Sequence, residues 1–124
     1  MEKLEHRLEA IGPGIEALRL KGAVDVFTYK DLKELIEKAS KDRQNPRLFI
    51  DMTEVSYVGS SGWSVLFLQA ASLEKAGGML CLGCLNERTQ RALHMIAPRK
   101  GMLMTAIDQA EALNFLLAPK APAS

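Results

Sequence analysis

The chain has little cysteine, no excess charge of either sign and no long apolar run. Only two of its 124 residues are cysteines, which makes the reducing cytoplasm the expected compartment. Its 16 basic residues nearly balance its 15 acidic residues, so the concentrated positive charge that nucleic acids and acidic membranes select is missing. No apolar stretch approaches the roughly 20 residues that cross a bilayer, and the charged N-terminus contains no secretory core. The sequence therefore predicts a cytoplasmic protein with neither a nucleic-acid partner nor direct membrane insertion.

The two cysteines, Cys81 and Cys84, have the CxxC spacing that redox sites and zinc sites share. A zinc site needs further ligands, but the two histidines, His6 and His94, are far apart in the sequence. A redox CxxC of the thioredoxin type opens a helix, whereas this pair ends a strand-like run. We therefore expect buried or half-buried structural thiols, with no metal and no other cofactor.

Hydrophobic patterning and turn residues predict strands and helices that alternate after an N-terminal hairpin. Two strands, over residues 4–10 and 11–22, flank the Gly12-Pro13-Gly14 turn, and Gly22 is expected to end the second. Apolar runs predict further strands over residues 47–52, 78–84 and 101–107. Four helices are predicted over residues 28–40, 61–76, 86–98 and 108–118, with Thr28, Asn86 and Asp108 as caps and Gly77-Gly78 and Pro98 as stops.

This order of elements predicts an α/β protein. Strands that alternate with helices from Arg47 onward imply a mainly parallel sheet with crossover helices, and the hairpin adds an antiparallel edge. No linker divides the chain, so we expect one domain over residues 1–118. A flexible Pro/Ala-rich tail is expected over residues 119–124.

Residues 57–63, YVGSSGW, lie after a predicted strand and before a predicted helix. A serine at a helix N-terminus can cap the free N–H groups of the first turn, and the same groups favour a phosphate placed there. Taken alone, the residues leave both a simple cap and a modified hydroxyl open. There is no nucleotide P-loop, no nucleophile elbow and no histidine placed as a base, so the protein is not expected to be an enzyme.

The segment DMTEVSYVGSSGW resembles the signature of the STAS domain family, which comprises the bacterial anti-sigma factor antagonists and their relatives. The matching positions are Asp51, Thr53, Val55, Tyr57, Ser60, Ser61 and Gly62. Upstream, LKGAVDVFT resembles the family's glycine-aspartate segment at Leu20, Gly22, Val24 and Asp25. The resemblance extends over about residues 3–117, and it implies a STAS-like fold with a mixed, mainly parallel sheet, an N-terminal hairpin and about four helices.

The resemblance also implies a regulatory role. An antagonist of this family binds an anti-sigma factor that is also a serine kinase, and it thereby releases a sigma factor. Phosphorylation of the first serine of the turn, here Ser60, breaks the complex, and a separate serine phosphatase resets it. The family pattern assigns partner binding to Asp25, Gly59, Ser60, Ser61 and Gly62, and the choice of Ser60 over Ser61 follows from the motif alone.

The chain departs from the family pattern at two positions of this turn. Gly59 stands where the family commonly has an aspartate, which favours the alternative of a non-phosphorylated adaptor or scaffold in a lipid-transport or stress-sensing assembly. Trp63 replaces an aliphatic residue and shares its helical spacing with Leu66 and Leu73, which predicts core packing. Val65 and Leu68 fall off that stripe and leave open an additional partner face on the helix.

Overall fold

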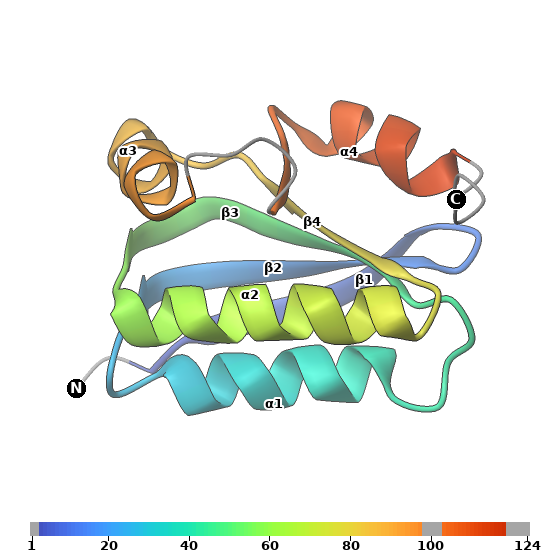
Figure 1. Ribbon diagram of the computed structural model, residues 1–124, viewed down its shortest axis with the longest axis horizontal. Coiled ribbons are helices and arrows are strands. Elements are labelled where there is room, and N and C mark those ends of the chain that lie inside the picture. The colour runs from blue at the N-terminus through green and yellow to red at the C-terminus, as the bar shows by residue number, and fades with distance from the viewer. Residues whose placement is uncertain (1–2, 98–102, 119–124) are drawn as a thin grey trace.

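The computed structural model describes residues 3–97 and 103–118, which form a five-stranded sheet with helices on both faces (Figure 1). The strands lie in the order β1-β2-β3-β4-β5; β1 and β2 are antiparallel, and all the other neighbours are parallel. The predicted fold class is therefore confirmed. The predicted stop at Pro98 and the predicted tail over residues 119–124 lie outside the described residues. No helix within the described ranges is long and apolar enough to cross a membrane.

The elements follow one another in the predicted order. β1 (Glu5–Gly12) and β2 (Ile15–Val24) form the hairpin, and they are followed by α1 (Tyr29–Ser40), β3 (Arg47–Val58) and α2 (Ser60–Lys75). The remaining elements are β4 (Met79–Gly83), α3 (Glu87–Ile96), β5 (Met104–Ala106) and α4 (Gln109–Leu117). Helices α1 and α2 cover one face of the sheet, and α3 and α4 lie on the other (Figure 1).

The central strand β3 is buried on both faces over its first half. Successive side chains of a strand point to opposite faces, so Leu48 and Ile50 pack into the cluster beneath α1 and α2. Phe49 points the other way and packs with Cys81 and Leu116 beneath α4. A strand covered on both faces needs a continuous apolar run, which explains the run that begins at Leu48.

Two strands are longer than the sequence predicted. β2 continues past Gly22 to Val24, because Gly22 adopts a left-handed φ of 120° at a register shift, where the strand bulges instead of ending. β3 continues to Val58, since its second half pairs with the end of β2, with Val24 opposite Val58. The carboxyl ends of the two strands therefore finish level with each other.

The helix caps are partly as predicted. Asn86 caps α3 by accepting a hydrogen bond from Thr89 N at 2.8 Å, and Asp108 caps α4 by accepting one from Glu111 N at 2.9 Å. The prediction for Thr28 was wrong: it occupies the N-cap position of α1, but its side chain does not cap the helix. Its hydroxyl donates to Ala23 O at 2.7 Å instead, so it serves the loop before the helix.

The end of α2 has the predicted pair of glycines. Gly77 adopts a left-handed φ of 81°, and its N–H donates to Glu74 O at 3.0 Å. The N–H of Gly78 donates to Leu73 O at 2.8 Å, which completes a Schellman motif. The chain then turns directly into β4.

Candidate functional site

The predicted site residues meet at the carboxyl ends of β2 and β3. The N–H of Gly59 donates to Val24 O at 2.8 Å, so the start of α2 is tied to the end of β2. Asp25 follows Val24 directly, and Ser60 is the first residue of α2. We call Asp25 and residues 59–62 the Ser60 rim; it lies at the end of the molecule where α1 and α2 begin (Figure 1).

The two serines of the turn differ in their exposure. Ser60 is exposed, whereas Ser61 is half-buried. Of the two alternatives left open, the serine cap does not hold, because β3 runs to Val58 and the helix begins one residue earlier than predicted, with Gly59 at the N-cap. The hydroxyl of Ser60 forms no hydrogen bond with any part of the chain that the structure describes. Of the two hydroxyls, that of Ser60 is therefore the more accessible.

Gly62 holds α2 close to the sheet. A Cβ atom at this buried position would lie 2.6 Å from Val24 Cγ1 and 2.9 Å from Val58 Cγ1. It would also lie 3.1 Å from Val24 O, which is a backbone atom. The glycine thus lets the first turn of α2 rest on the ends of two strands, and this contact fixes where Ser60 is presented.

Asp25 shapes the loop beside Ser60. Its carboxylate accepts a hydrogen bond from Phe27 N at 2.9 Å, and its carbonyl accepts one from Tyr29 N at 2.9 Å. This turn leaves Val26 65% exposed and Phe27 67% exposed. The hydrogen bonds of Asp25 therefore stabilise its own loop, and this loop keeps the side chains of Val26 and Phe27 in solvent.

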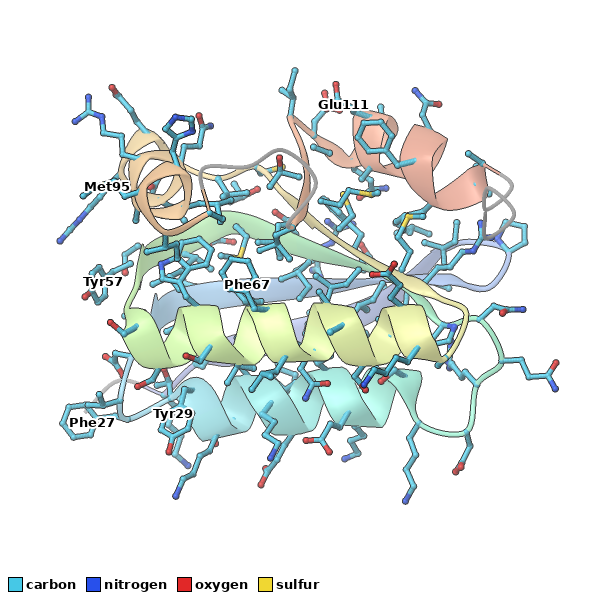
Figure 2. All side chains as sticks on the ribbon, in the orientation of Figure 1. Phe27, Tyr29, Tyr57, Phe67, Met95 and Glu111 are labelled. Carbon is cyan, nitrogen blue, oxygen red and sulfur yellow. The ribbon has the colours of Figure 1, made fainter. Side chains whose placement is uncertain are left out.

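Further apolar side chains are exposed at the same end of the molecule. Figure 2 shows Phe27, Tyr57 and Met95 projecting from this end, from the β2–α1 loop, the end of β3 and α3. Met95 is 83% exposed, and the guanidinium of Arg88 lies 5.0 Å from the centre of the Tyr57 ring. We call Val26, Phe27, Tyr57 and Met95 the apolar rim. They are spread along this end from the α1 layer to the α3 layer (Figure 2), and exposed apolar side chains of this kind can contribute to a protein-binding surface.

With one exception, the apolar residues of α2 are buried or exposed as their helical spacing predicted. Trp63, Leu66 and Leu73 are buried in the core, which confirms that prediction. Leu68 is 69% exposed, as expected for a residue off the buried stripe. Val65 is also off that stripe but is buried, because a helix that lies between the sheet and α1 is covered on more than one side.

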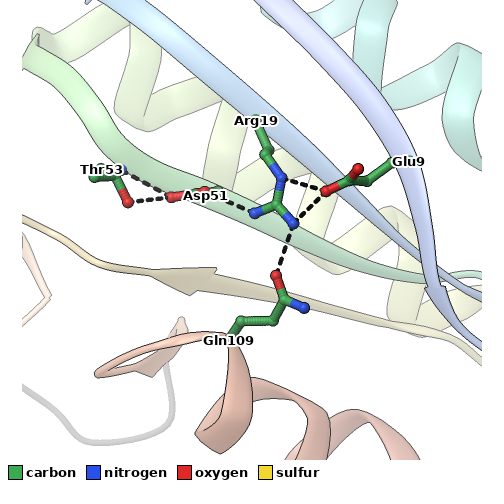
Figure 3. Close-up of polar contacts among 5 residues, drawn as sticks. All are labelled: Glu9, Arg19, Asp51, Thr53 and Gln109. Atoms are coloured by element: carbon green, nitrogen blue, oxygen red, sulfur yellow. Dashed lines mark hydrogen bonds and ion pairs between the residues drawn. The ribbon is translucent and has the colours of Figure 1, made fainter.

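A second polar cluster, centred on Arg19, lies on the sheet face that carries α4 (Figure 3). The guanidinium donates to Glu9 at 2.6 Å, to Asp51 at 2.8 Å and to Gln109 at 2.7 Å. Asp51 also accepts hydrogen bonds from the backbone and the hydroxyl of Thr53. The cluster joins β1, β2, β3 and α4. In the sequence, only the match of Asp51 to the STAS signature pointed to it.

The charges of this cluster stabilise one another. Burial raises the pKa of Asp51, but the hydrogen bonds from Thr53 and Arg19 outweigh burial and hold this pKa below its ordinary value. Burial lowers the pKa of Arg19, and the two carboxylates beside it more than offset that effect. Both groups therefore remain charged at neutral pH, and the ion pair serves the fold.

We expect Asp51→Asn to lower the free energy of unfolding by about 1–2 kcal/mol at neutral pH, because Arg19 loses a charged hydrogen-bond partner. A carboxyl group whose pKa is lowered by folding stabilises the protein above its unfolded pKa, about 3.9. That contribution is lost as the pH falls through the lower, folded pKa. Urea denaturation at neutral pH and at about pH 2 checks this.

The matched control is Glu54→Gln, an exposed acid on the same strand whose oxygen lies 3.9 Å from Lys21 Nζ. We expect it to change the free energy of unfolding by less than about 0.5 kcal/mol. An equal loss for Asp51→Asn at both pH values would contradict an electrostatic role for Asp51.

The cysteines are buried or half-buried, as predicted. Cys81 is buried and Cys84 is half-buried, and both thiols are free. Burial raises the pKa of the Cys81 thiol to about 12, with a smaller contribution from Glu111, which is the opposite of the shift that a reactive thiol needs. Within residues 3–97 and 103–118, no three His, Cys, Asp or Glu side chains are grouped so that they could hold a metal ion.

Comparison with known proteins places the chain in a family. Its fold is similar to that of an anti-sigma factor antagonist from Mycobacterium paratuberculosis, with 22% identity, a TM-score of 0.80 and coverage of 93% of this chain and 95% of the other. It is also similar to the Bacillus cell fate determinant SpoIIAA in its phosphorylated form, with 18% identity, a TM-score of 0.67 and coverage of 90% and 98%.

A third similar structure is a sulfate transporter family protein from Wolinella succinogenes, with 16% identity, a TM-score of 0.69 and coverage of 88% and 89%. Identities this low show a shared fold and no more. No curated protein sequence matches the chain. The family model of the STAS domain matches residues 10–104, well over half of the chain. The chain therefore belongs to the STAS domain family.

Proposed function

We propose that this protein is a cytoplasmic anti-sigma factor antagonist that binds an anti-sigma factor with serine kinase activity and is switched off by phosphorylation of Ser60. The observation that carries the proposal is the exposed hydroxyl of Ser60, which has no hydrogen bond in the described structure and lies beside the apolar rim. Similar structures that are anti-sigma factor antagonists support this general role.

The Ser60 rim suits a switch that changes binding while leaving the fold intact. A phosphate on Ser60 would add about −1.5 to −2 charges at a helix N-terminus, where the free N–H groups and the helix dipole favour an anion. The fold would therefore tolerate the modification. A partner that covers the apolar rim would have to remove that charge from water without supplying a cation of its own, and this penalty opposes binding.

The partner surface that follows from this proposal has two parts. The Ser60 rim supplies the Ser60 hydroxyl, and it lets a partner approach the backbone closely. Its residues are Asp25, Gly59, Ser60, Ser61 and Gly62. The apolar rim supplies the area that a partner can remove from water. A serine phosphatase would need access to the same hydroxyl, and Ser60 is exposed at the first position of its helix.

The direct test is a kinase reaction. The chain is incubated with ATP and the cognate anti-sigma factor kinase, and the phosphate is mapped by mass spectrometry. We expect one phosphate on Ser60 and none on Ser61, because only the first serine is exposed. Modification of Ser61, or of neither serine, would overturn the assignment of the switch.

Gly59, the position where the family aspartate is missing, is the N-cap of α2 with φ −88° and ψ 178°, a conformation open to any residue. We expect Gly59→Asp to raise the free energy of unfolding by about 0.5–1 kcal/mol, because a carboxylate there can accept from the free N–H groups of the first turn. The new Cβ would lie 3.3 Å from the Tyr57 ring, which is 43% exposed and has room to shift.

Gly59→Ala is the matched control for this variant. It brings the same loss of backbone freedom in the unfolded chain but no capping oxygen. Urea denaturation should therefore give Gly59→Asp a larger free energy of unfolding than Gly59→Ala. If the two variants are equally stable, the free N–H groups of α2 are not accessible to an anion at this position. A phosphate on the neighbouring Ser60 would then lack the local compensation described above.

The alternative function is a non-phosphorylated adaptor or scaffold in a larger assembly, and the observation that favours it is Gly59. Without a carboxylate next to Ser60, a kinase has one recognition element fewer. Co-purification from cells distinguishes the two functions. A stable large complex that is unchanged by ATP would support the adaptor, and a complex that ATP disrupts would support the switch.

A further inference from the structure

An arginine lies one aromatic ring away from the Ser60 rim. The guanidinium of Arg88 lies over the ring of Tyr57, 5.0 Å from its centre. Gly59 is a second neighbour of this ring, because a Cβ atom at Gly59 would lie 3.3 Å from both Cε1 and the hydroxyl oxygen of Tyr57. The Tyr57 ring therefore separates the guanidinium of Arg88 from the residue directly before Ser60.

The start of α3 is held beside this ring. Asn86, the cap of α3, donates from its side-chain amide to Val55 O at 3.1 Å. Val55 lies two residues before Tyr57 on β3, and Arg88 lies in the first turn of α3. Figure 2 shows Tyr57 projecting between the start of α2 and α3. The position of Arg88 next to Tyr57 is therefore set by a contact between two elements of the fold.

The side chain of Arg88 can change its partner. It is exposed, and it forms no ion pair and no hydrogen bond among the residues that the structure describes. The acid next to it, Glu87, is already paired with Arg91. An exposed contact between a cation and an aromatic ring is weak, whereas arginine binds phosphate through charge-assisted and often bidentate hydrogen bonds. A phosphate within reach would therefore draw Arg88 away from the ring.

A phosphate on Ser60 would lie at the end of α2 where Tyr57 is found. The Cα–Cβ bonds of a helix tilt towards its N-terminus, and Ser60 is the first residue of α2, directly after Gly59. The phosphate would therefore be carried back towards Gly59 and its neighbour Tyr57. Asp25, the charged residue of the Ser60 rim, has the same sign as the phosphate, so a compensating cation has to come from another element.

We propose that Arg88 is the partner, within this chain, of a phosphate on Ser60, an inference that rests on the proposed function. On phosphorylation the guanidinium leaves the Tyr57 ring and pairs with the phosphate, which links the start of α3 to the start of α2. The pair stabilises the phosphorylated form of the chain. It still lies on the surface that the anti-sigma factor has to cover, and because removing an ion pair from water is costly, it does not restore binding.

The test uses phosphoserine incorporated at position 60 during translation, so it does not depend on the kinase. The second pKa of the phosphate, about 6 in the absence of a partner, is measured on the full chain by phosphorus NMR. We expect this pKa to be lower in the otherwise wild-type chain than in Arg88→Gln by about 0.5 or more, because a neighbouring cation favours the doubly charged form. Arg88→Lys keeps the positive charge and should restore most of the difference.

Lys30→Gln is the matched control. Lys30 is a cation at the start of α1, and its Nζ also lies over a tyrosine ring, 6.0 Å from the centre of Tyr29. We expect this variant to leave the pKa of the phosphate unchanged. The NMR signal of the Arg88 Nε–H group should also shift between the unmodified and the phosphorylated chain, as the guanidinium leaves the ring.

An equal phosphate pKa in the wild-type background and in Arg88→Gln would overturn the role of Arg88. So would a rise of this pKa in Lys30→Gln that Arg88→Gln does not produce, because the compensating cation would then belong to α1. The proposed switch fails by a different result, the absence of phosphate on Ser60 after the kinase reaction.

Discussion

Replacing Ser60 with aspartate is expected to weaken binding to the anti-sigma factor about a hundredfold, while the fold stays intact. The carboxylate would have to be buried against an apolar partner surface without a compensating cation, and this penalty is a few kcal/mol. Ser60→Ala should bind as the wild type does, because the hydroxyl forms no hydrogen bond that folding needs. Affinities are measured by isothermal titration calorimetry with the purified anti-sigma factor.

The matched control for Ser60→Asp is Ser72→Asp. Ser72 is an exposed serine of the same helix, and it lies on the last turns of α2, away from the Ser60 rim. The added charge is the same, so a general effect of charge would weaken binding in both variants. Equal affinity for Ser60→Asp and the wild type would contradict a partner that covers the Ser60 rim.

Replacing Gly62 with alanine is expected to lower the free energy of unfolding by about 1–3 kcal/mol. At a solvent-exposed position inside a helix, alanine in place of glycine stabilises the protein by about 1 kcal/mol. The contacts of the new Cβ therefore decide whether the free energy of unfolding rises or falls. Those contacts are 2.6 Å to Val24 Cγ1, 2.9 Å to Val58 Cγ1 and 3.1 Å to the Val24 carbonyl oxygen. Both valines lie in paired strands and cannot move without shifting the sheet.

Urea denaturation measures this loss, and Gly12→Ala is the control. The nearest atom to a Cβ at Gly12 is Ile15 Cδ1 at 3.5 Å, an ordinary contact distance. We expect Gly12→Ala to be within about 0.5 kcal/mol of the wild type. A Gly62→Ala protein that is as stable as the wild type would show that α2 does not depend on close contact with the strand ends.

The fold was predictable because its signals are local. The caps at Asn86 and Asp108 act on N–H groups three residues away, and the Gly77-Gly78 stop acts on the turn directly before it. Errors arose where a distant segment decides the outcome. Whether β3 stops after Met52 or runs on to Val58 depends on its pairing with β2, which no local pattern of β3 contains.

The candidate site shows the same contrast between features that local sequence determines and features that distant segments determine. The position of Ser60 between a strand and a helix followed from the sequence, and the family resemblance indicated Asp25 as a second binding residue. The relative exposure of Ser60 and Ser61 did not, because it depends on the residue at which α2 begins. The Arg19 cluster could not be predicted from the sequence either, because Arg19 and Gln109 are 90 residues apart and meet only when α4 packs on the sheet.

The most direct test of the proposed switch compares the same protein before and after phosphorylation. The chain is phosphorylated by its cognate kinase to one phosphate per molecule, the modified residue is mapped, and both forms are titrated into the anti-sigma factor. We expect a phosphate on Ser60, an unchanged circular dichroism spectrum and an affinity weaker by about a hundredfold or more. An equal affinity for the two forms would contradict it.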